Sequence, residues 1–383
     1  MKCKLSDICS FRKGKVEVEN LNAKNYISTE NMLPNKCGIT EASSLPTVSL
    51  TQEYNSGDVL VSNIRPYFKK IWQAEYDGGC SNDVLVFVPK PNTDKDFLYY
   101  VLADDDFFTY SMATSKGTKM PRGDKTSIMQ YEVPLIDLQV QKKIASVLKA
   151  LDERIKLNNE INWNLAEQSQ AIFAEFMCKY PYVLSPLGDM AEIIDCLHSK
   201  KPKAVNGTTY QLLQLNNITD SGFLDLSSKY YISKSDYENW TRKCEIVEGD
   251  CVITNVGRIG AVSQAPNGTH AAMGRNMTCI RLRNDKPFYS YLITALLSPH
   301  IRREIMKNTD EGTIMGALNV KNIPLLLFPM FALPTMNALE DLLSPIRKAI
   351  EQNYLSNQML SLLRDSLLPR LMSGELDVSN IEI

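Results

Sequence analysis

The chain has 383 residues, of which 44% are hydrophobic and 22% are charged. This length and composition exclude a disordered polymer and allow two or three domains, each with its own core. The formal net charge of −2, from 42 Lys+Arg and 44 Asp+Glu, excludes a generally basic nucleic-acid coat but leaves room for local basic patches. No run of about 18 apolar residues predicts a membrane-spanning helix.

Cysteine and histidine usage predicts a reduced protein without a metal centre. The nine cysteines include no Cys-x-x-Cys pair, and the N-terminus lacks the apolar stretch of a signal peptide. We therefore expect free thiols and a cytoplasmic location. Cys196 and His198 form the only close Cys/His pair in the sequence. Because a structural zinc site needs four ligands, this pair by itself predicts no metal site.

The first mixed segment covers residues 1–136. Its short β-type runs, such as 58–62 and 84–88, are punctuated by Gly, Asn, Asp and Pro, a pattern typical of β-strands. A shorter helix is expected over 95–112. The segment therefore predicts a mixed α and β domain.

A long helix is expected over residues 137–180. Asp137 is a favourable N-cap residue, and Pro181 terminates the pattern. At about 1.5 Å per residue the helix would span roughly 65 Å. A helix of this length with one apolar stripe cannot be buried against a single small domain, so a partner helix is expected.

A second mixed segment follows over residues 181–333, with a strand-like run at 251–254 and a shorter helix expected over 287–307. Residues 334–383 then contain a second long helix and a C-terminal tail. The two halves of the chain therefore share one order of elements.

The second long helix has a less regular pattern than the first. Pro345 and Pro369 both lie within it, so we expect a late start or kinks. The pair Ser373 and Gly374 predicts its end, because glycine is favoured just after a helix C-terminus.

The chain contains an internal repeat with a period close to 195 residues. Residues 117–176 align without a gap with 312–371, and the segment 56–60 resembles 248–252. The shared order of these similarities predicts two copies of one structural plan. Two unrelated domains followed by similar helices are the alternative.

The two long helices are predicted to pair with each other, antiparallel, and to act as a spacer between the mixed domains. Their apolar residues recur mainly at spacings of three and four, as in a coiled coil. Both copies place Asn on this stripe, where it either fixes the register or lies at its wet edge. The residues predicted to form the pairing surface are Leu148, Leu151, Ile155, Asn158, Leu165, Leu343, Ile346, Ile350, Asn353 and Leu360.

Specific segments resemble the specificity subunit of Type I restriction–modification enzymes. Residues 148–162 (LKALDERIKLNNEIN) are similar to the central conserved helix of that family, and 362–376 (LLRDSLLPRLMSGEL) to its distal helix with a terminal Ser-Gly-Glu. Residues 187–191 resemble the opening of a target recognition domain. The chain departs from the family at Val140, where a glutamate is usual before the matching Gln141.

The resemblance implies an α+β architecture of two target recognition domains, residues 1–136 and 181–333, separated by an antiparallel two-helix coiled coil formed by 137–180 and 334–383. Each domain would read one half of a bipartite, asymmetric double-stranded DNA target. The helices would set the half-site spacing and bind the modification subunits, two in number by the family's plan, with restriction/translocase subunits joining through the complex. S-adenosylmethionine, ATP and Mg²⁺ are expected on those partners and not on this chain.

No catalytic motif is found in the sequence. It has no P-loop, no Pro-Pro dipeptide of the kind a DNA amino-methyltransferase needs, and no Gly-x-Ser-x-Gly elbow. The acidic cluster 104–106 is interpreted as a solvated face of a helix or its end. A non-catalytic subunit is therefore favoured over two alternatives, a self-contained modification or restriction enzyme and a coiled-coil adaptor without a DNA role.

Local clusters of cations, aromatic residues and Asn are the candidates for DNA contact. Arg can bind guanine edges, Asn can bind adenine edges, and Lys more often meets phosphate. The loop 115–125 has four cations, whereas its repeat counterpart 310–320 has none. The predicted DNA-binding residues are Arg65, Tyr67, Lys69, Lys116, Lys119, Arg122, Lys125, Lys200, Lys201, Lys203, Arg258, Arg275 and Asn276.

Overall fold

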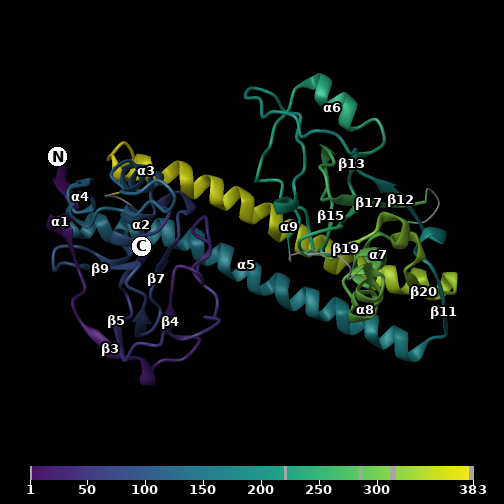
Figure 1. The fold of residues 1–383 in the computed structure, drawn as a ribbon, viewed down its shortest axis with the longest axis horizontal. Coiled ribbons are helices and arrows are strands. Elements are labelled where there is room, and N and C mark those ends of the chain that lie inside the picture. The colour runs from purple at the N-terminus through teal and green to yellow at the C-terminus, as the bar shows by residue number, and fades with distance from the viewer. Residues whose placement is uncertain (1, 220–221, 284–286, 311–315, 379–383) are drawn as a thin grey trace. The chain divides into compact units, whose positions relative to one another are not determined.

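The computed structural model describes residues 2–219, 222–283, 287–310 and 316–378, and the chain forms two compact units. Unit 1 comprises residues 1–155 and 359–383, and unit 2 comprises residues 156–358. Two long helices, α5 (Leu138–Lys179) and α9 (Leu333–Met372), each contribute a segment to both units (Figure 1). The mixed architecture with two long helices that the sequence predicts is therefore present.

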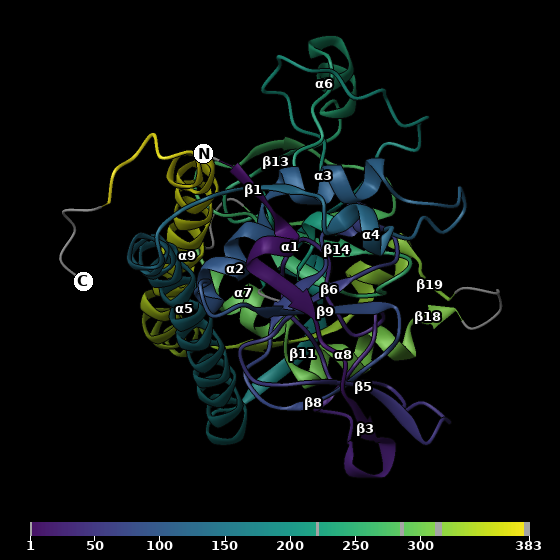
Figure 2. The same ribbon diagram turned by 90° about the vertical axis from the view of Figure 1, so that its left-hand side faces the viewer.

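A four-stranded antiparallel sheet with the order β2-β9-β6-β7 forms the centre of unit 1. Figure 2 labels its two inner strands, β9 and β6. All four side chains of β6 are buried, which explains why this strand is a continuous apolar run in the sequence. A second sheet has the order β3-β5-β8-β4, and β1 pairs with β10. The strands are β1 (Lys2–Lys4), β2 (Cys9–Phe11), β3 (Lys15–Glu17), β4 (Tyr26–Ile27), β5 (Leu50–Tyr54), β6 (Val59–Ser62), β7 (Ile71–Gln73), β8 (Gly78–Cys80), β9 (Val84–Pro89) and β10 (Glu132–Pro134).

Unit 2 repeats this plan with a four-stranded sheet in the order β12-β17-β14-β15, which is the order of the equivalent strands in unit 1. Three strand pairs, β11–β20, β13–β16 and β18–β19, complete its described sheets. The strands are β11 (Tyr182–Pro186), β12 (Ala191–Asp195), β13 (Glu245–Val247), β14 (Cys251–Thr254), β15 (Val262–Gln264), β16 (His270–Ala272), β17 (Met277–Leu282), β18 (Thr309–Asp310), β19 (Ala317–Leu318) and β20 (Leu327–Phe331).

The turns that precede β6 and β14 show that the two sheets are copies of one structure. Asp58 accepts a hydrogen bond from the amide of Asn55, and Asp250 accepts one from Val247, at 2.8 and 2.9 Å. The glycine before each aspartate has a left-handed backbone, with φ of 92° and 84°. The internal repeat inferred from sequence is therefore confirmed at the level of individual hydrogen bonds.

The shorter helices predicted at 95–112 and 287–307 are present, but each is divided into two. Asp104 caps the second helix of the first pair, and Ser298 caps that of the second pair, so the break occurs where a polar side chain satisfies free backbone amides. Asp105 forms ion pairs with Lys36 and Lys69, so the acidic cluster is a paired helix start and not simply a solvated face. The short helices are α1 (Leu5–Ile8), α2 (Lys95–Ala103), α3 (Asp105–Ala113), α4 (Lys125–Ile128), α6 (Lys234–Trp240), α7 (Tyr289–Leu296) and α8 (Pro299–Lys307).

Helix α5 begins and ends where the sequence predicts. The Asp137 carboxylate accepts a hydrogen bond from the amide of Gln139 at 2.9 Å, and the helix ends at Lys179, two residues before Pro181. No helix in the described part of the chain is long and apolar enough to cross a membrane.

The prediction of a late start for the second long helix is wrong, because α9 begins at Leu333 and continues through Pro345. A proline is well tolerated in a first helical turn, and Pro334 lies there. Pro345 is exposed, while Leu339 and Leu343 are buried in the core of unit 2. The packing of the apolar face offsets the local cost of a proline within the helix.

The helices run antiparallel within each unit. In unit 2, Asn158 donates a hydrogen bond to Asn357 at 2.8 Å, and Asn353 donates one to Asn162 at 2.9 Å. In unit 1 the pairing continues, with Leu148 packed in one core with Leu368 and Leu371. The asparagines thus bind each other across the seam, which favours the register role over the wet-edge role.

The predicted pairing residues divide by burial. Four are buried, and the remaining six are half-buried, as expected for a two-helix seam with an open edge. The buried residues are Leu148, Asn158, Leu343 and Ile350; the half-buried residues are Leu151, Ile155, Leu165, Ile346, Asn353 and Leu360.

Candidate nucleic-acid interface

Two candidate segments that are distant in the sequence meet in unit 1. Loop L1 (residues 63–70) follows β6, and loop L2 (residues 115–125) precedes and enters α4. Ile64 of L1 forms a β-bridge with Arg122 of L2, and Arg122 forms a second bridge with Lys116 within L2. L1 and L2 therefore form one surface, which the sequence did not show.

The cations of L2 have different environments on this surface. Arg122 is 3.2 Å from the carboxylate of Asp83, and Lys116 is 2.7 Å from that of Asp124. Asp124 also accepts hydrogen bonds from the amide and hydroxyl of Ser127, and these contacts hold the pKa of the Asp124 carboxyl at about 2, chiefly through Lys116. The remaining predicted cations of L2, Lys119 and Lys125, are exposed.

Loop L1 places two cations in left-handed backbone conformations. Arg65, the third residue after β6, and Lys69, the second before β7, both have φ of 50°. The same two places in unit 2 are occupied by Gly257 and Gly260, with φ of 78° and 73°. A left-handed backbone costs free energy for any residue except glycine, so unit 1 holds these two cations at a cost that unit 2 does not bear.

Other groups of L1 also face outward or lack a partner. Tyr67 is 49% exposed, and its ring lies 4.6 Å from that of Phe68, centroid to centroid. Lys69 donates to Asp105 at 2.7 Å. The Arg65 Nε atom is buried and has no hydrogen-bond partner among the described residues.

In unit 2, three of the predicted residues line one hollow of about 400 Å³. Lys201 lies over the ring of Tyr230, with its Nζ atom 3.9 Å from the ring centroid. Arg275 and Asn276 are exposed and directly precede β17. The hollow is lined by Lys201, Leu212, Gln214, Leu215, Asn216, Trp240, Gly274, Arg275 and Asn276.

A neighbouring hollow of about 530 Å³ contains Arg258 and shares Leu215 and Asn216 with the first. The guanidinium of Arg258 donates to the carbonyl of Ile218 at 3.0 Å, which holds this side chain against the 215–219 segment. Lys200 and Lys203 are exposed and do not line either hollow. Four of the predicted residues of unit 2 therefore lie on one continuous hollowed surface.

The turn that carries Arg275 is held against the protein by a close backbone approach. A Cβ atom on Gly274 would lie 2.1 Å from the carbonyl oxygen of Leu213, so no larger residue fits there. Asn276 has φ of 64°, a conformation that Asn tolerates better than most residues. Both features fix the direction in which the two exposed side chains leave the sheet.

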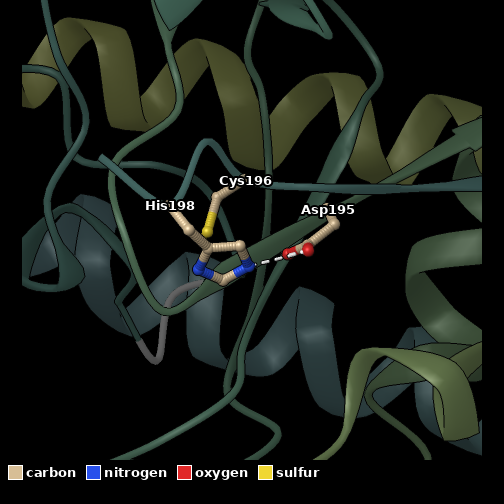
Figure 3. Close-up of side chains that lie close together, drawn as sticks. All are labelled: Asp195, Cys196 and His198. Carbon is tan, nitrogen blue, oxygen red and sulfur yellow. Dashed lines mark hydrogen bonds and ion pairs between the residues drawn. The ribbon is translucent and has the colours of Figure 1, made fainter.

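Two groups of potential metal ligands lie in unit 2. Figure 3 shows Asp195, Cys196 and His198, which come from the end of β12 and the residues after it, with His198 Nε2 2.8 Å from an Asp195 carboxylate oxygen. Burial raises the pKa of the Cys196 thiol, which favours its neutral form. The structure thus adds a third ligand to the pair seen in the sequence, still short of the four of a structural zinc site.

The second group is Cys244, Asp250 and Cys279, all buried. The Asp250 carboxylate accepts hydrogen bonds from the Arg281 guanidinium at 2.6 and 2.8 Å and from the amide of Val247. The Asp250 carboxylate therefore stabilises the repeated turn through these hydrogen bonds.

Sequence reasoning missed two polar groups that belong to these surfaces. Asn216 lines both hollows of unit 2, in a segment without a distinctive pattern. Asp83 contacts Arg122 in unit 1, and it directly precedes β9 as Asn276 precedes β17. Extending the repeat alignment from the strands to the residues before them would have found Asp83.

The first part of the chain matches a known family model, and the chain is similar to several known proteins. Residues 1–167 match the family described as Type I restriction modification DNA specificity domain. The HindI specificity subunit of Haemophilus influenzae is 27% identical over 164 residues, 40% of this chain and 36% of that protein. The EcoDI specificity subunit of Escherichia coli is 26% identical over 134 residues, 33% of this chain and 30% of that protein. The match thus covers about a third of the length of these two relatives.

Similarity also extends over longer stretches of the chain. The MjaIX specificity subunit of Methanocaldococcus jannaschii is 20% identical over 322 residues, 77% of this chain and 72% of that protein. The crystal structure of the Type I restriction–modification S subunit from M. genitalium superposes with a TM-score of 0.55 at 14% identity, covering 99% of this chain and 96% of that one.

The fold is therefore that of a restriction–modification S subunit, with two repeated α/β units and two long helices.

Proposed function

We propose that this protein is the sequence-specific DNA recognition subunit of a Type I restriction–modification complex, with residues 1–136 and 181–333 each reading one half of a bipartite DNA target. The observation that carries the proposal is the repetition of one sheet in which different exposed cations and amides lie beyond the C-terminal ends of β6 and β14. L1 and L2 form this surface in unit 1, and the two hollows form it in unit 2. Equivalent surfaces with different side chains suit two different half-sites.

The subunit has no catalytic role of its own in this proposal. Its relatives are specificity subunits, and the chemistry of methylation and cleavage would be carried out by the modification and restriction/translocase subunits. Those partners would bind S-adenosylmethionine, ATP and Mg²⁺. This chain would contribute the choice of DNA sequence.

The helices would set the spacing between the two half-sites and bind the modification subunits. Support for a docking role comes from apolar side chains that the helices leave exposed. On α5, Trp163 is 65% exposed; on α9, Met359 and Leu362 are 74% and 71% exposed. Exposed apolar surface of this kind is typical of an interaction site.

The first test removes two cations from L2. The double variant Lys119→Ala, Arg122→Ala should weaken DNA binding of the assembled methyltransferase. The magnitude of the slope of log affinity against log salt concentration should fall by about one unit for each phosphate contact that is lost. The matched control, Lys13→Ala with Lys15→Ala, removes two exposed cations elsewhere in unit 1. Unchanged affinity and salt slope in the first variant would remove L2 from the interface.

The second test concerns the spacer. Insertion of one heptad into α5 alone should break the asparagine register of the helix seam or change the gap between half-sites. Methylome sequencing of host cells that carry the intact or the altered gene measures that gap. An unchanged target with unchanged spacing would contradict the role of the helices as a ruler.

A further inference from the structure

Asp83 and Asn276 occupy the same place in the two copies of the sheet. Ser62 lies opposite Val84 in unit 1, and Thr254 lies opposite Met277 in unit 2. In both units, the residue just after the first strand donates its backbone amide to the carbonyl of the residue just before the second strand. These bonds, Asn63 to Asp83 and Asn255 to Asn276, are 2.8 and 2.9 Å long.

Arg122 and Ala317 also occupy equivalent positions in the two units. Gly123 donates its amide to the carbonyl of Asn63 at 3.1 Å, and Leu318 donates its amide to that of Asn255 at 2.9 Å. The residue before each donor is Arg122 in unit 1 and Ala317 in unit 2. The same two positions therefore hold an arginine and an aspartate in one unit, and an alanine and an asparagine in the other.

The fold does not require the Arg122–Asp83 ion pair. Its side chains are 56% and 34% exposed, and exposed ion pairs contribute about 0–1 kcal/mol to stability. Unit 2 forms the same backbone hydrogen bonds without an ion pair at these positions. A carboxylate next to DNA is repelled by phosphate. An aspartate on a DNA-facing surface is therefore expected to bind a specific hydrogen-bond donor.

We propose that Asp83 and Arg122 together read one G·C base pair and that Asn276 reads an adenine at the corresponding place in the other half-site. Arg122 would donate to the O6 and N7 atoms of guanine, while Asp83 would accept from the N4 amine of the paired cytosine. Asn276 would bind the N6 and N7 atoms of adenine. This inference rests on the proposed function and adds specificity-determining residues to it.

The ion pair suits this role because it orients both groups before DNA is bound. At 3.2 Å, the guanidinium and the carboxylate lie side by side, as do the acceptor edge of guanine and the donor of its cytosine in the major groove. In unit 2, Ala317 presents no charged group at this place, and the exposed Asn276 amide offers both a donor and an acceptor.

The test is a set of single variants in the full chain, assembled with its modification subunits and measured by binding selection on a randomised DNA library and by methylome sequencing. Asp83→Asn should change the base preference at one position of one half-site by roughly ten- to a hundredfold and leave the other half-site unchanged. Asn276→Asp should do the same in the opposite half-site only. Glu132→Gln is the matched control, because it removes another exposed 3.2 Å ion pair, with Lys2, from unit 1.

Two outcomes would overturn the inference. Unchanged base preference at every position would show that Asp83 reads no base. An equal change of affinity for all sequences, a gain for Asp83→Asn or a loss for Asn276→Asp, would show only an electrostatic effect. If Asp83→Asn fails to fold, Arg122→Lys replaces it, because lysine keeps the charge but cannot bind guanine bidentately, so the base preference at the same position should change. Failure of the proposed function is separate, because then the unaltered complex itself would select no gapped sequence.

Discussion

Asn158 of α5, which is buried, donates a side-chain hydrogen bond of 2.8 Å to the half-buried Asn357 of α9 within unit 2. Asn357 in turn donates to Asn159 at 2.8 Å, and one helical turn along the seam the pair of Asn162 and Asn353 repeats the arrangement. A polar ladder of this kind stabilises one alignment of the two helices relative to others, because any slip leaves buried amides without partners.

Asn158→Ala should lower the free energy of unfolding by about 1–3 kcal/mol, because it leaves the Asn357 oxygen without its buried donor. The double variant Asn158→Leu, Asn357→Leu should recover this loss, since an apolar pair satisfies the seam without polar groups. Urea denaturation followed by circular dichroism measures both. A double variant less stable than the single one would show that the hydrogen bond itself dominates.

Gln141→Ala should destabilise unit 1 by about 2–3 kcal/mol. The buried Gln141 side chain accepts from the amide of Asp94 and donates to the carbonyls of Asn92 and Ile136, so truncation leaves three backbone groups unsatisfied. Gln139→Ala, two residues earlier and exposed, is the control and should change the midpoint of thermal unfolding little. Equal effects of the two substitutions would contradict the anchoring role of Gln141.

Arg65→Gly and Lys69→Gly should separate stability from DNA binding. Each substitution relieves a left-handed backbone, so the free energy of unfolding should stay level or rise by up to about 1 kcal/mol. DNA affinity of the assembled complex should nevertheless fall, because two cations of L1 are lost. Asn35→Gly, which relieves a residue with φ of 57° and removes no charge, is the control. Undiminished affinity would exclude L1 from the interface.

The carboxyl of Asp124 should titrate with a pKa of about 2 in the folded protein, against an ordinary value of 3.8. Because the pKa is lowered on folding, its stabilising contribution is complete above pH 4 and is lost as the pH falls toward 2. Carbon-detected NMR of the side-chain carboxyl measures this titration. Lys116→Met should raise the pKa toward the ordinary value, and an unchanged pKa would show that Ser127 alone holds the carboxylate.

The sequence could predict those long-range features in which similar residues recur at a regular spacing. The apolar stripe of α5, its cap at Asp137 and the repeat of 195 residues all follow from spacing. The start of α9 could not be predicted in this way. Pro345 suggested a break in the helix, but the burial of Leu339 and Leu343 offsets the local free-energy cost of this proline.

The candidate site was predictable only in part. Lys201, Arg275 and Asn276 were named from residue type, but their meeting in one hollow depends on strand pairing, which has no local signature. The contact of L1 with L2 depends on the bridge between Ile64 and Arg122, and the sequence between them carries no pattern that links the two positions. The repeated counterpart of L2 includes residues 311–315, which lie outside the described residues.

The composition of unit 1 has a consequence for how the protein is made. Its core contains Leu5 and Ile8 from the start of the chain together with Leu368, Leu371 and Val378 from the far end. On the ribosome, Leu5 and Ile8 emerge long before Leu368, Leu371 and Val378, so part of the apolar surface of unit 1 stays uncovered until those residues follow, while unit 2, residues 156–358, is synthesised in between. Leu5 and Ile8 can therefore reach their final packing only after unit 2 has been translated.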